Sequence, residues 1–317
     1  MSKSKKASVK TLRSDNELRT ALSISEVKGA LYSLFHYTNM EALAKIVAGK
    51  GIRLSRIDRM NDGTERFTGA DRTYAFCLSA VPTESAGMWI AYGVPRRDAI
   101  RVRFSGKLLH DLCEANDGRI EVFPVIGDHA QKESVIGEIS LQYVGYVSRS
   151  GDRVHVRNMI YQLSSPKQRS RIAVMDDYGS FIKFLGWEYE HEIRLVVRLD
   201  EAIDARKIEL PLNDVVEKML MYKPRLQKGS NGMPSVIVGP WGSRNDFLKK
   251  FKSVASMLKC NNREDVQYFL SHSHDELGLV RESEFKGKIH LGHCAKCDKN
   301  CNCDCVYHEG AAEEDKI

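Results

Sequence analysis

The run IRLVVRL at residues 193 to 199 is the feature that most limits what this chain can fold into. Aliphatic side chains fill five of its seven positions, a composition that is typical of a strand. A strand this apolar has to be covered by other elements, so we expect it to enter a hydrophobic core. The chain is therefore expected to contain a sheet that is buried over much of its area.

Other segments with the same signals surround this run. Strands are predicted at residues 34 to 38, directly after the helix that follows this first strand, and at 73 to 79, 99 to 105, 119 to 125 and 139 to 147. Helices are predicted at residues 18 to 31, after a capping box at 14 to 17, and at 39 to 49, 88 to 93, 107 to 115, 167 to 185 and 243 to 258. No strand–helix–strand unit of constant length repeats, so the pattern favours an α+β fold over a doubly wound parallel sheet.

Composition and charge suggest one large domain with two extensions. The chain has 317 residues, of which 42% are apolar and 28% charged, enough to bury a sizeable core. We expect a basic flexible tail at 1–13, a domain at 14–284 and a Cys/His-rich tail at 285–317. Of the net charge of +6, five positive charges precede the first acidic residue, Asp15. The nearly neutral body argues against a protein held to nucleic acid mainly by its overall field.

Two local basic runs remain candidate nucleic-acid contacts. They are KQRSR at 167 to 171 and KPRLQK at 223 to 228, and the alternative is that each is a solvated face. The longest apolar run, at 74 to 81, is far shorter than the roughly 18 residues of a membrane-spanning helix. No apolar segment follows the N-terminal lysines as in a secretory signal. We therefore expect a cytoplasmic protein with no membrane partner.

Five of the eight cysteines crowd into the last 24 residues. In a reducing compartment such a cluster favours metal binding over disulfides. Cys294 and Cys297 have the C-x2-C spacing of a zinc knuckle, and the other candidate ligands are Cys301, Cys303, Cys305, His293 and His308. Five thiolates exceed one tetrahedral site, so some are spare or a second zinc binds. The alternative is a disordered thiol-rich tail.

The segment WEYEHEIR at 187 to 194 precedes the apolar strand. If it is extended, Glu188, Glu190 and Glu192 project to one side, and Arg194 continues that side. Three adjacent carboxylates raise the pKa of at least one of them. The set is either a solvated edge or the rim of a cleft, and the apolar run that follows favours the rim.

Two further segments carry side chains that suit a pocket. His36 lies inside the apolar strand at 34 to 38, where it is either a satisfied core histidine or a group that points into a pocket. Trp89 and Tyr92 lie three residues apart on one helical face, and Asn61 and Asp62 precede Gly63 in a turn. The aromatic pair is either core or pocket lining.

The order of these blocks resembles a bacterial protein family. FHYT, RLSRIDRMNDGTE, CLS followed by MWIAYG, WEYEHEIR and VIVGP together resemble the domain-of-unknown-function family numbered 2971, from about residue 31 to about residue 280. The His-Tyr-Thr strand also resembles the opening of the ADP-ribosyltransferase superfamily, which includes DNA-modifying toxins and RNA 2′-phosphotransferases. This second resemblance implies a split antiparallel sheet with flanking helices around an NAD cleft.

The histidine-tyrosine-glutamate branch of that superfamily supplies roles for the matching residues. The resemblance implies that His36 binds a ribose of NAD, that Tyr92 or Tyr37 stacks on nicotinamide, and that Glu192 acts at the reaction centre. Glu190 would be the first glutamate of the E-x-E pair. Thr38 and Ser79 would complete the NAD contacts.

Two functions follow as expectations. The first is an NAD-dependent ADP-ribosyltransferase acting on a macromolecule, for example a toxin or antiphage effector that modifies RNA or DNA and is controlled by an antitoxin or another regulatory protein. The second is a non-catalytic binding module for nucleic acid or protein, with the cysteine-rich tail as a zinc knuckle. The three glutamates and His36 separate the two, because a binding module needs no carboxylates beside a cleft.

Overall fold

The computed structural model describes residues 8–12, 14–60, 69–93, 98–127, 129–157, 159–163, 181–212, 236–257 and 280–286. Within them, strands dominate and helices are few, so the predicted α+β class is confirmed. None of the helices in these ranges is long and apolar enough to cross a membrane.

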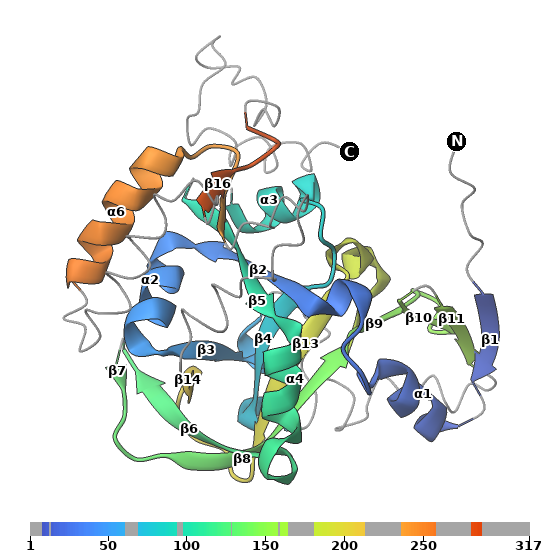
Figure 1. Cartoon of the computed structure of the whole chain (residues 1–317). Helices are drawn as coiled ribbons and strands as arrows, with labels where there is room; N and C mark the ends of the chain where they lie inside the picture. Colours follow the sequence, from blue (N-terminus) through green and yellow to red (C-terminus); the bar gives the residue numbers. More distant parts are fainter. Residues whose placement is uncertain are drawn as a thin grey trace, which may run out of the picture.

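The larger sheet contains eleven strands, and six of them close into a barrel (Figure 1). The order around the barrel is β13 (Glu192–Leu199), β8 (Val135–Tyr143), β6 (Arg119–Ile126), β14 (Lys207–Pro211), β3 (Gly51–Arg56) and β4 (Thr73–Ser79). From β4 the sheet continues through β2 (Ser33–Asn39), β5 (Ala99–Ser105), β15 (Val236–Val238) and β16 (Val280–Glu282), while β7 (His129–Ala130) pairs with β6.

The barrel closes because β13 is paired along both of its edges. One edge is antiparallel to β4 from Glu192 to Arg198, and the other is antiparallel to β8 from Ile193 to Leu199. Alternate residues from Ile193 to Leu199 enter the main core, whereas Val196 faces a second core. The apolar run is thus buried as predicted, but the expected split sheet is not what forms, since β13 bonds two neighbours within one closed sheet.

The neighbouring strands β2 and β4 are hardly paired with each other. Within the described residues these strands pair at a single position, Phe35 with Ser79. Beyond it, β2 runs with β5 along its whole length, whereas β4 turns to β3 and β13. The side chains that follow Phe35 on β2 therefore face the side chains of β4 across a gap.

Three of the described helices, α2 (Met40–Gly49), α4 (Gly106–Glu114) and α6 (Arg244–Met257), contribute residues to the main core. α2 starts at Asn39, whose side chain accepts a hydrogen bond from the Ala42 amide, and it packs on α6 (Figure 1). α4 begins at Ser105, and the short α3 (Ala86–Gly93) lies against β2 and β5. Short 3-10 turns are η1 (Gly29–Tyr32), η2 (Ile57–Arg59), η4 (Ala70–Arg72) and η5 (Ala115–Gly118).

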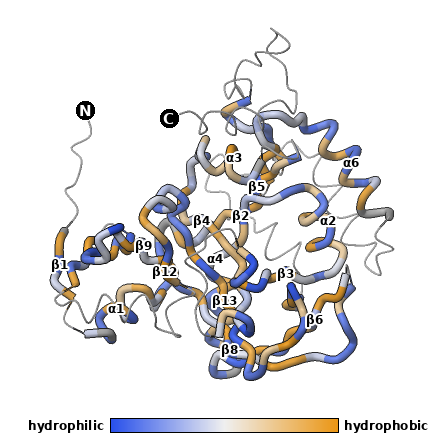
Figure 2. The backbone as a smooth tube through the Cα atoms, turned by 180° about the vertical axis from the view of Figure 1, so that it is seen from behind, coloured by the Kyte–Doolittle hydropathy of each residue, from blue (hydrophilic) through white to orange (hydrophobic). Residues whose placement is uncertain are grey.

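A smaller five-stranded sheet lies to one side, as Figures 1 and 2 both show. Its order is β1 (Ser8–Leu12), β11 (Met159–Leu163), β10 (Arg153–Val156), β9 (Gly145–Val147) and β12 (Ile182–Phe184). α1 (Asp15–Leu22) packs on it through the second core, which includes Leu18 and Leu22.

This sheet corrects three predictions. Residues 8 to 12, expected to belong to a flexible tail, form a strand parallel to β11 because Leu12 is buried in the second core. The predicted strand at 139 to 147 is divided at Val144, so that β8 and β9 belong to different sheets. Residues 182 to 184 form a strand where a helix was predicted.

The first helix is also shorter than predicted. Its capping serine, Ser14, accepts a hydrogen bond from the Glu17 amide, as the capping box requires. The helix ends at Leu22 because Ser23 takes an extended conformation and bonds the carbonyl of Arg19 through both its amide and its hydroxyl.

Candidate functional site

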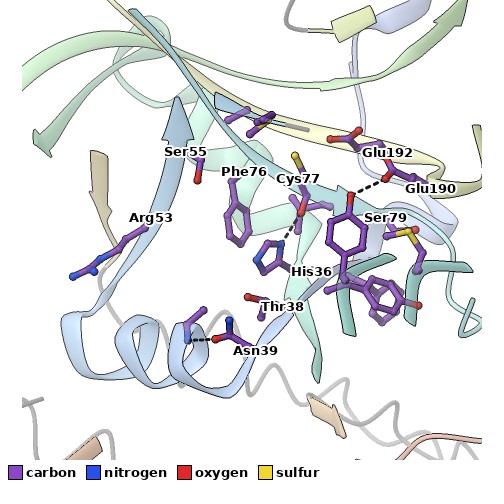
Figure 3. Close-up of a pocket in the computed structure, with 18 of the residues that line it drawn as sticks. His36, Thr38, Asn39, Arg53, Ser55, Phe76, Cys77, Ser79, Glu190 and Glu192 are labelled. Carbon is purple, nitrogen blue, oxygen red and sulfur yellow. Dashed lines mark hydrogen bonds between the residues drawn. The ribbon is translucent and has the colours of Figure 1, made fainter. Parts of the chain in front are cut away.

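A cavity of about 560 Å³ lies at the gap between β2 and β4 (Figure 3). Its walls come from β2, α2, β3, β4 and α3, and from the segment that joins β12, the 3-10 helix η7 (Leu185–Glu190) and β13. Seven residues singled out from the sequence line it, namely His36, Tyr37, Thr38, Ser79, Tyr92, Glu190 and Glu192. The fold thus brings into one cavity segments that are more than 150 residues apart in the chain.

Glu190 and Glu192 form the carboxylate end of the cavity. Lys183 Nζ lies 2.7 Å from Glu190 Oε2 and 3.0 Å from Glu192 Oε2, so one ammonium group is shared by both. Arg194 Nε donates to Glu192 Oε1 at 2.7 Å. All four side chains are buried, and the two negative charges are matched by two positive charges.

The two carboxylates differ in their affinity for protons. Burial alone would raise the pKa of Glu192, but Arg194 and Lys183 outweigh it and lower the pKa to about 2. Burial and the neighbouring charge of Glu192 raise the pKa of Glu190. Glu192 is therefore ionised throughout the physiological range, whereas Glu190 takes up a proton more readily than an ordinary glutamate.

Tyr92 connects α3 to the carboxylate end. Its hydroxyl donates to Glu190 Oε1 at 2.6 Å, while 38% of the residue stays exposed. Tyr37 is 7% exposed, its ring packs edge-on against Trp89 at 4.9 Å, and its hydroxyl accepts from the Ser85 amide. Of the two tyrosines considered for stacking, Tyr92 is thus the more exposed.

His36 lies in the middle of the cavity wall, where β2 faces β4 (Figure 3). Its Nδ1 lies 2.8 Å from the carbonyl oxygen of Cys77. A carbonyl only accepts, so Nδ1 carries the proton and Nε2 is left as an acceptor. Burial against Phe76, at 4.1 Å between ring centroids, lowers the pKa of His36 to about 4 despite the bond to Cys77. The imidazole is neutral near pH 7.

Four cationic side chains that the sequence reasoning missed also line the cavity, namely Lys45, Arg53, Arg59 and Lys207. Arg53 lies across the cavity from Glu190 and Glu192 in Figure 3, and Lys45 pairs with Glu41 of the same lining at 2.7 Å. Arg53 also pairs with Glu209 at 3.0 Å. One sequence signal was present, because Arg53 and Ser55 alternate on the strand after α2 and so share a face.

Lys183 was missed as well. Its segment was predicted to be helical, so nothing in the sequence placed its side chain beside the glutamates. In the structure β12 runs parallel to β9, and Lys183 enters the carboxylate cluster.

Glu188 does not join the cavity, contrary to prediction. Residues 185 to 190 form a 3-10 helix rather than an extended segment, and His191 has a positive φ of 44°. With three residues per turn, Glu188 points away from Glu190. It pairs with His155 Nδ1 at 2.9 Å on the smaller sheet. Trp89 is also outside the cavity lining, fully buried in a third core.

The predicted zinc ligands, from Cys294 to Cys305, lie outside the described residues. So do the turn at 61 to 63 and the basic runs at 167 to 171 and 223 to 228. Among the residues that are described, no group of three or more histidine, cysteine or acidic side chains is placed to hold a metal ion.

Comparisons with protein-family models, curated proteins and solved structures gave no match to this chain.

Proposed function

We propose that this chain cleaves the bond between nicotinamide and ribose in NAD and transfers ADP-ribose to a macromolecule. The observation that supports it most is the convergence of His36, Tyr92, Glu190 and Glu192 on one cavity. These are the residue types that the resemblance to the ADP-ribosyltransferase superfamily associates with NAD. The proposal relies on this local opening between β2 and β4, not on the barrel.

The two carboxylates suit the two halves of such a reaction. When nicotinamide leaves with the electrons of its bond to ribose, positive charge develops on the ribose, and the permanently ionised Glu192 stabilises it. The acceptor then forms the new bond to the same carbon and loses a proton. Glu190, whose pKa is raised, is suited to take that proton or to orient a ribose hydroxyl.

The rest of the cavity suits the rest of NAD. Tyr92, which lines the cavity and is partly exposed, would stack on nicotinamide, and Nε2 of His36 would accept a hydrogen bond from a ribose hydroxyl. Thr38 and Ser79 border the same opening. Lys45, Arg53, Arg59 and Lys207 provide positive charge for the two phosphates.

We further propose an acceptor in RNA or DNA, a cytoplasmic role as a toxin or antiphage effector, and control by an antitoxin or another regulatory protein. The C-terminal cysteines would hold zinc. These wider proposals rest on the resemblance and on the sequence.

A non-catalytic binding module is the second candidate. The observation in its favour is that Lys183 pairs with both glutamates and Arg194 pairs with Glu192, as in a purely structural network. In this case the cavity binds a ligand without changing it.

Incubation of the purified protein with labelled NAD and separate pools of protein, RNA and DNA tests the choice. Transfer of label to one pool, with release of nicotinamide, is expected for the enzyme. Glu192→Gln should lose both, whereas Glu188→Gln, a matched change outside the cavity, should keep them. Binding of NAD without nicotinamide release would support the binding module, and failure to bind NAD would overturn the proposed NAD site.

A further inference from the structure

The segment from Val280 to Lys286 is joined to the region of the cavity by a buried carboxylate. β16, at its start, pairs in parallel with β15, and the Ser283 amide continues this contact by donating to the Val238 carbonyl at 2.8 Å. The segment thereby reaches Glu84, which is about 200 residues earlier in the chain.

Glu84 accepts hydrogen bonds from both sides. From the segment Val280–Lys286 it accepts hydrogen bonds donated by the hydroxyl of Ser283 and by the amide of Glu284, the latter at 3.1 Å. From α3 it accepts a hydrogen bond donated by the indole N–H of Trp89 at 3.1 Å. The Glu84 side chain is 2% exposed, and Arg281 Nη2 lies 3.7 Å from it. A carboxylate suits this position because it accepts from all of these donors and donates to none.

Trp89 links Glu84 to the cavity through its packing. It is fully buried in the third core with Tyr37, Met88, Ala99 and Ile237, against which Phe285 of the C-terminal segment also packs. Three residues further along α3, Tyr92 reaches Glu190. Met88, Tyr37 and Tyr92 all line the cavity, so a shift of Trp89 moves part of its wall.

A helix as short as α3 has little stability of its own, so tertiary contacts decide where it lies. The bond between Trp89 and Glu84 is one such contact near the middle of the helix, and the bond between Tyr92 and Glu190 is another near its end. Both are made by the same eight-residue element. Loosening the first therefore changes the geometry of the second.

We propose that Glu84 is a positioning residue that fixes α3 to the segment Val280–Lys286 and thereby sets the place of Tyr92 over Glu190. Its effect on catalysis rests on the proposed function. Its effect on the position of Tyr92 does not, so the two can be tested separately.

The test uses the full chain, labelled with ¹³C in the tyrosine rings, in the absence of NAD. The signal of Tyr92 among the twelve tyrosines is assigned with Tyr92→Phe. Glu84→Gln keeps the shape of the side chain but turns an N–H₂ group toward the donors, so we expect the Tyr92 signal to shift or broaden. Ser283→Ala, which removes one donor and leaves the carboxylate, should shift it by less, and it also serves if Glu84→Gln does not fold.

Glu282→Gln is the matched control. Glu282 lies in the same segment but bonds Lys286 and the Arg244 amide instead of Glu84. It should leave the Tyr92 signal in place. In the presence of NAD, Glu84→Gln should slow nicotinamide release about tenfold or more, since small misplacements of catalytic groups have effects of this size.

An unchanged Tyr92 signal in folded Glu84→Gln or Ser283→Ala protein would overturn the proposal. An equal shift of the Tyr92 signal in Glu282→Gln would also overturn it, because general loosening of the segment Val280–Lys286 would then explain the shift without Glu84. If the wild-type protein does not cleave NAD, the proposed function fails, while the NMR comparison still decides on Glu84.

Discussion

Glu190 and Glu192 are two residues apart, share the ammonium group of Lys183, and have pKa values shifted in opposite directions. The difference between the two pKa values arises from Arg194, whose charged Nε–H donates a hydrogen bond to Glu192. Glu190 instead accepts a hydrogen bond from the uncharged hydroxyl of Tyr92. Pairs of titrating groups with separated pKa values are a common basis for dividing acid and base roles in an active site.

Glu192→Gln should abolish nicotinamide release, because the amide keeps the shape but loses the negative charge. It should also lower the free energy of unfolding by about 2 kcal/mol, since Lys183 and Arg194 lose part of their charge compensation in a buried site. Urea denaturation and chromatographic assay of nicotinamide check the two effects. Release at the wild-type rate would remove Glu192 from the mechanism and transfer its role to Glu190.

His36→Ala should weaken the affinity for NAD about tenfold, the effect of one lost hydrogen bond. Isothermal titration calorimetry measures it. The result that contradicts the prediction is an unchanged affinity together with a large fall in melting temperature, which would make His36 a core residue whose role ends at its bond to Cys77.

His36 and Glu192 should each lower the stability of the protein in a separate step as the pH is lowered, whereas Glu190, whose pKa is raised, should contribute in the opposite direction. The pKa of His36 is below its ordinary value of 6.5, so the unfolded state binds more protons between about pH 6.5 and 4 and stability declines over that window. Glu192, with a folded-state pKa of about 2 against 4.5, adds a loss from about pH 4.5 downward. Denaturation at a series of pH values should show the first step reduced in His36→Ala, and an identical pH profile would contradict the assignment.

Lys207→Ala should reduce the affinity for ADP-ribose severalfold and make it less sensitive to salt, because Lys207 is one of the cationic residues that line the cavity. Lys107→Ala is the control, since it removes the same charge from α4, where Lys107 pairs with Asp111. Calorimetry at two salt concentrations distinguishes the two variants. Equal loss of affinity in both would indicate that only the overall charge matters.

The cysteine-rich tail should hold about one zinc ion per chain, or two if the surplus thiols form a second site. The informative truncation is after Lys286, because Ser283, Glu284 and Phe285 take part in the contacts around Glu84 and Trp89. Elemental analysis should find no zinc in the truncated protein, and NAD binding should persist. A metal-free full-length protein would contradict the prediction.

The sequence by itself determined the elements whose signals are local. The strands at Thr73–Ser79 and Ala99–Ser105 and the helix that starts after Asn39 lie where composition, alternation and capping placed them. The residue types of the candidate site were also readable, since a histidine inside an apolar strand and an E-x-E before a buried strand stand out without any knowledge of contacts.

Only the tertiary structure decided which of these residues meet and in what state. The closure of the barrel depends on β13 pairing with two strands that are distant in the chain, and the conformation of residues 185 to 190 depends on their contacts with β9 and β12. The ionisation of Glu190 and Glu192 depends on Lys183, which the sequence predicted to lie on a helix. Strand pairing, burial and Coulomb interactions act between residues that are near in space, so a linear pattern specifies the groups but not their partners.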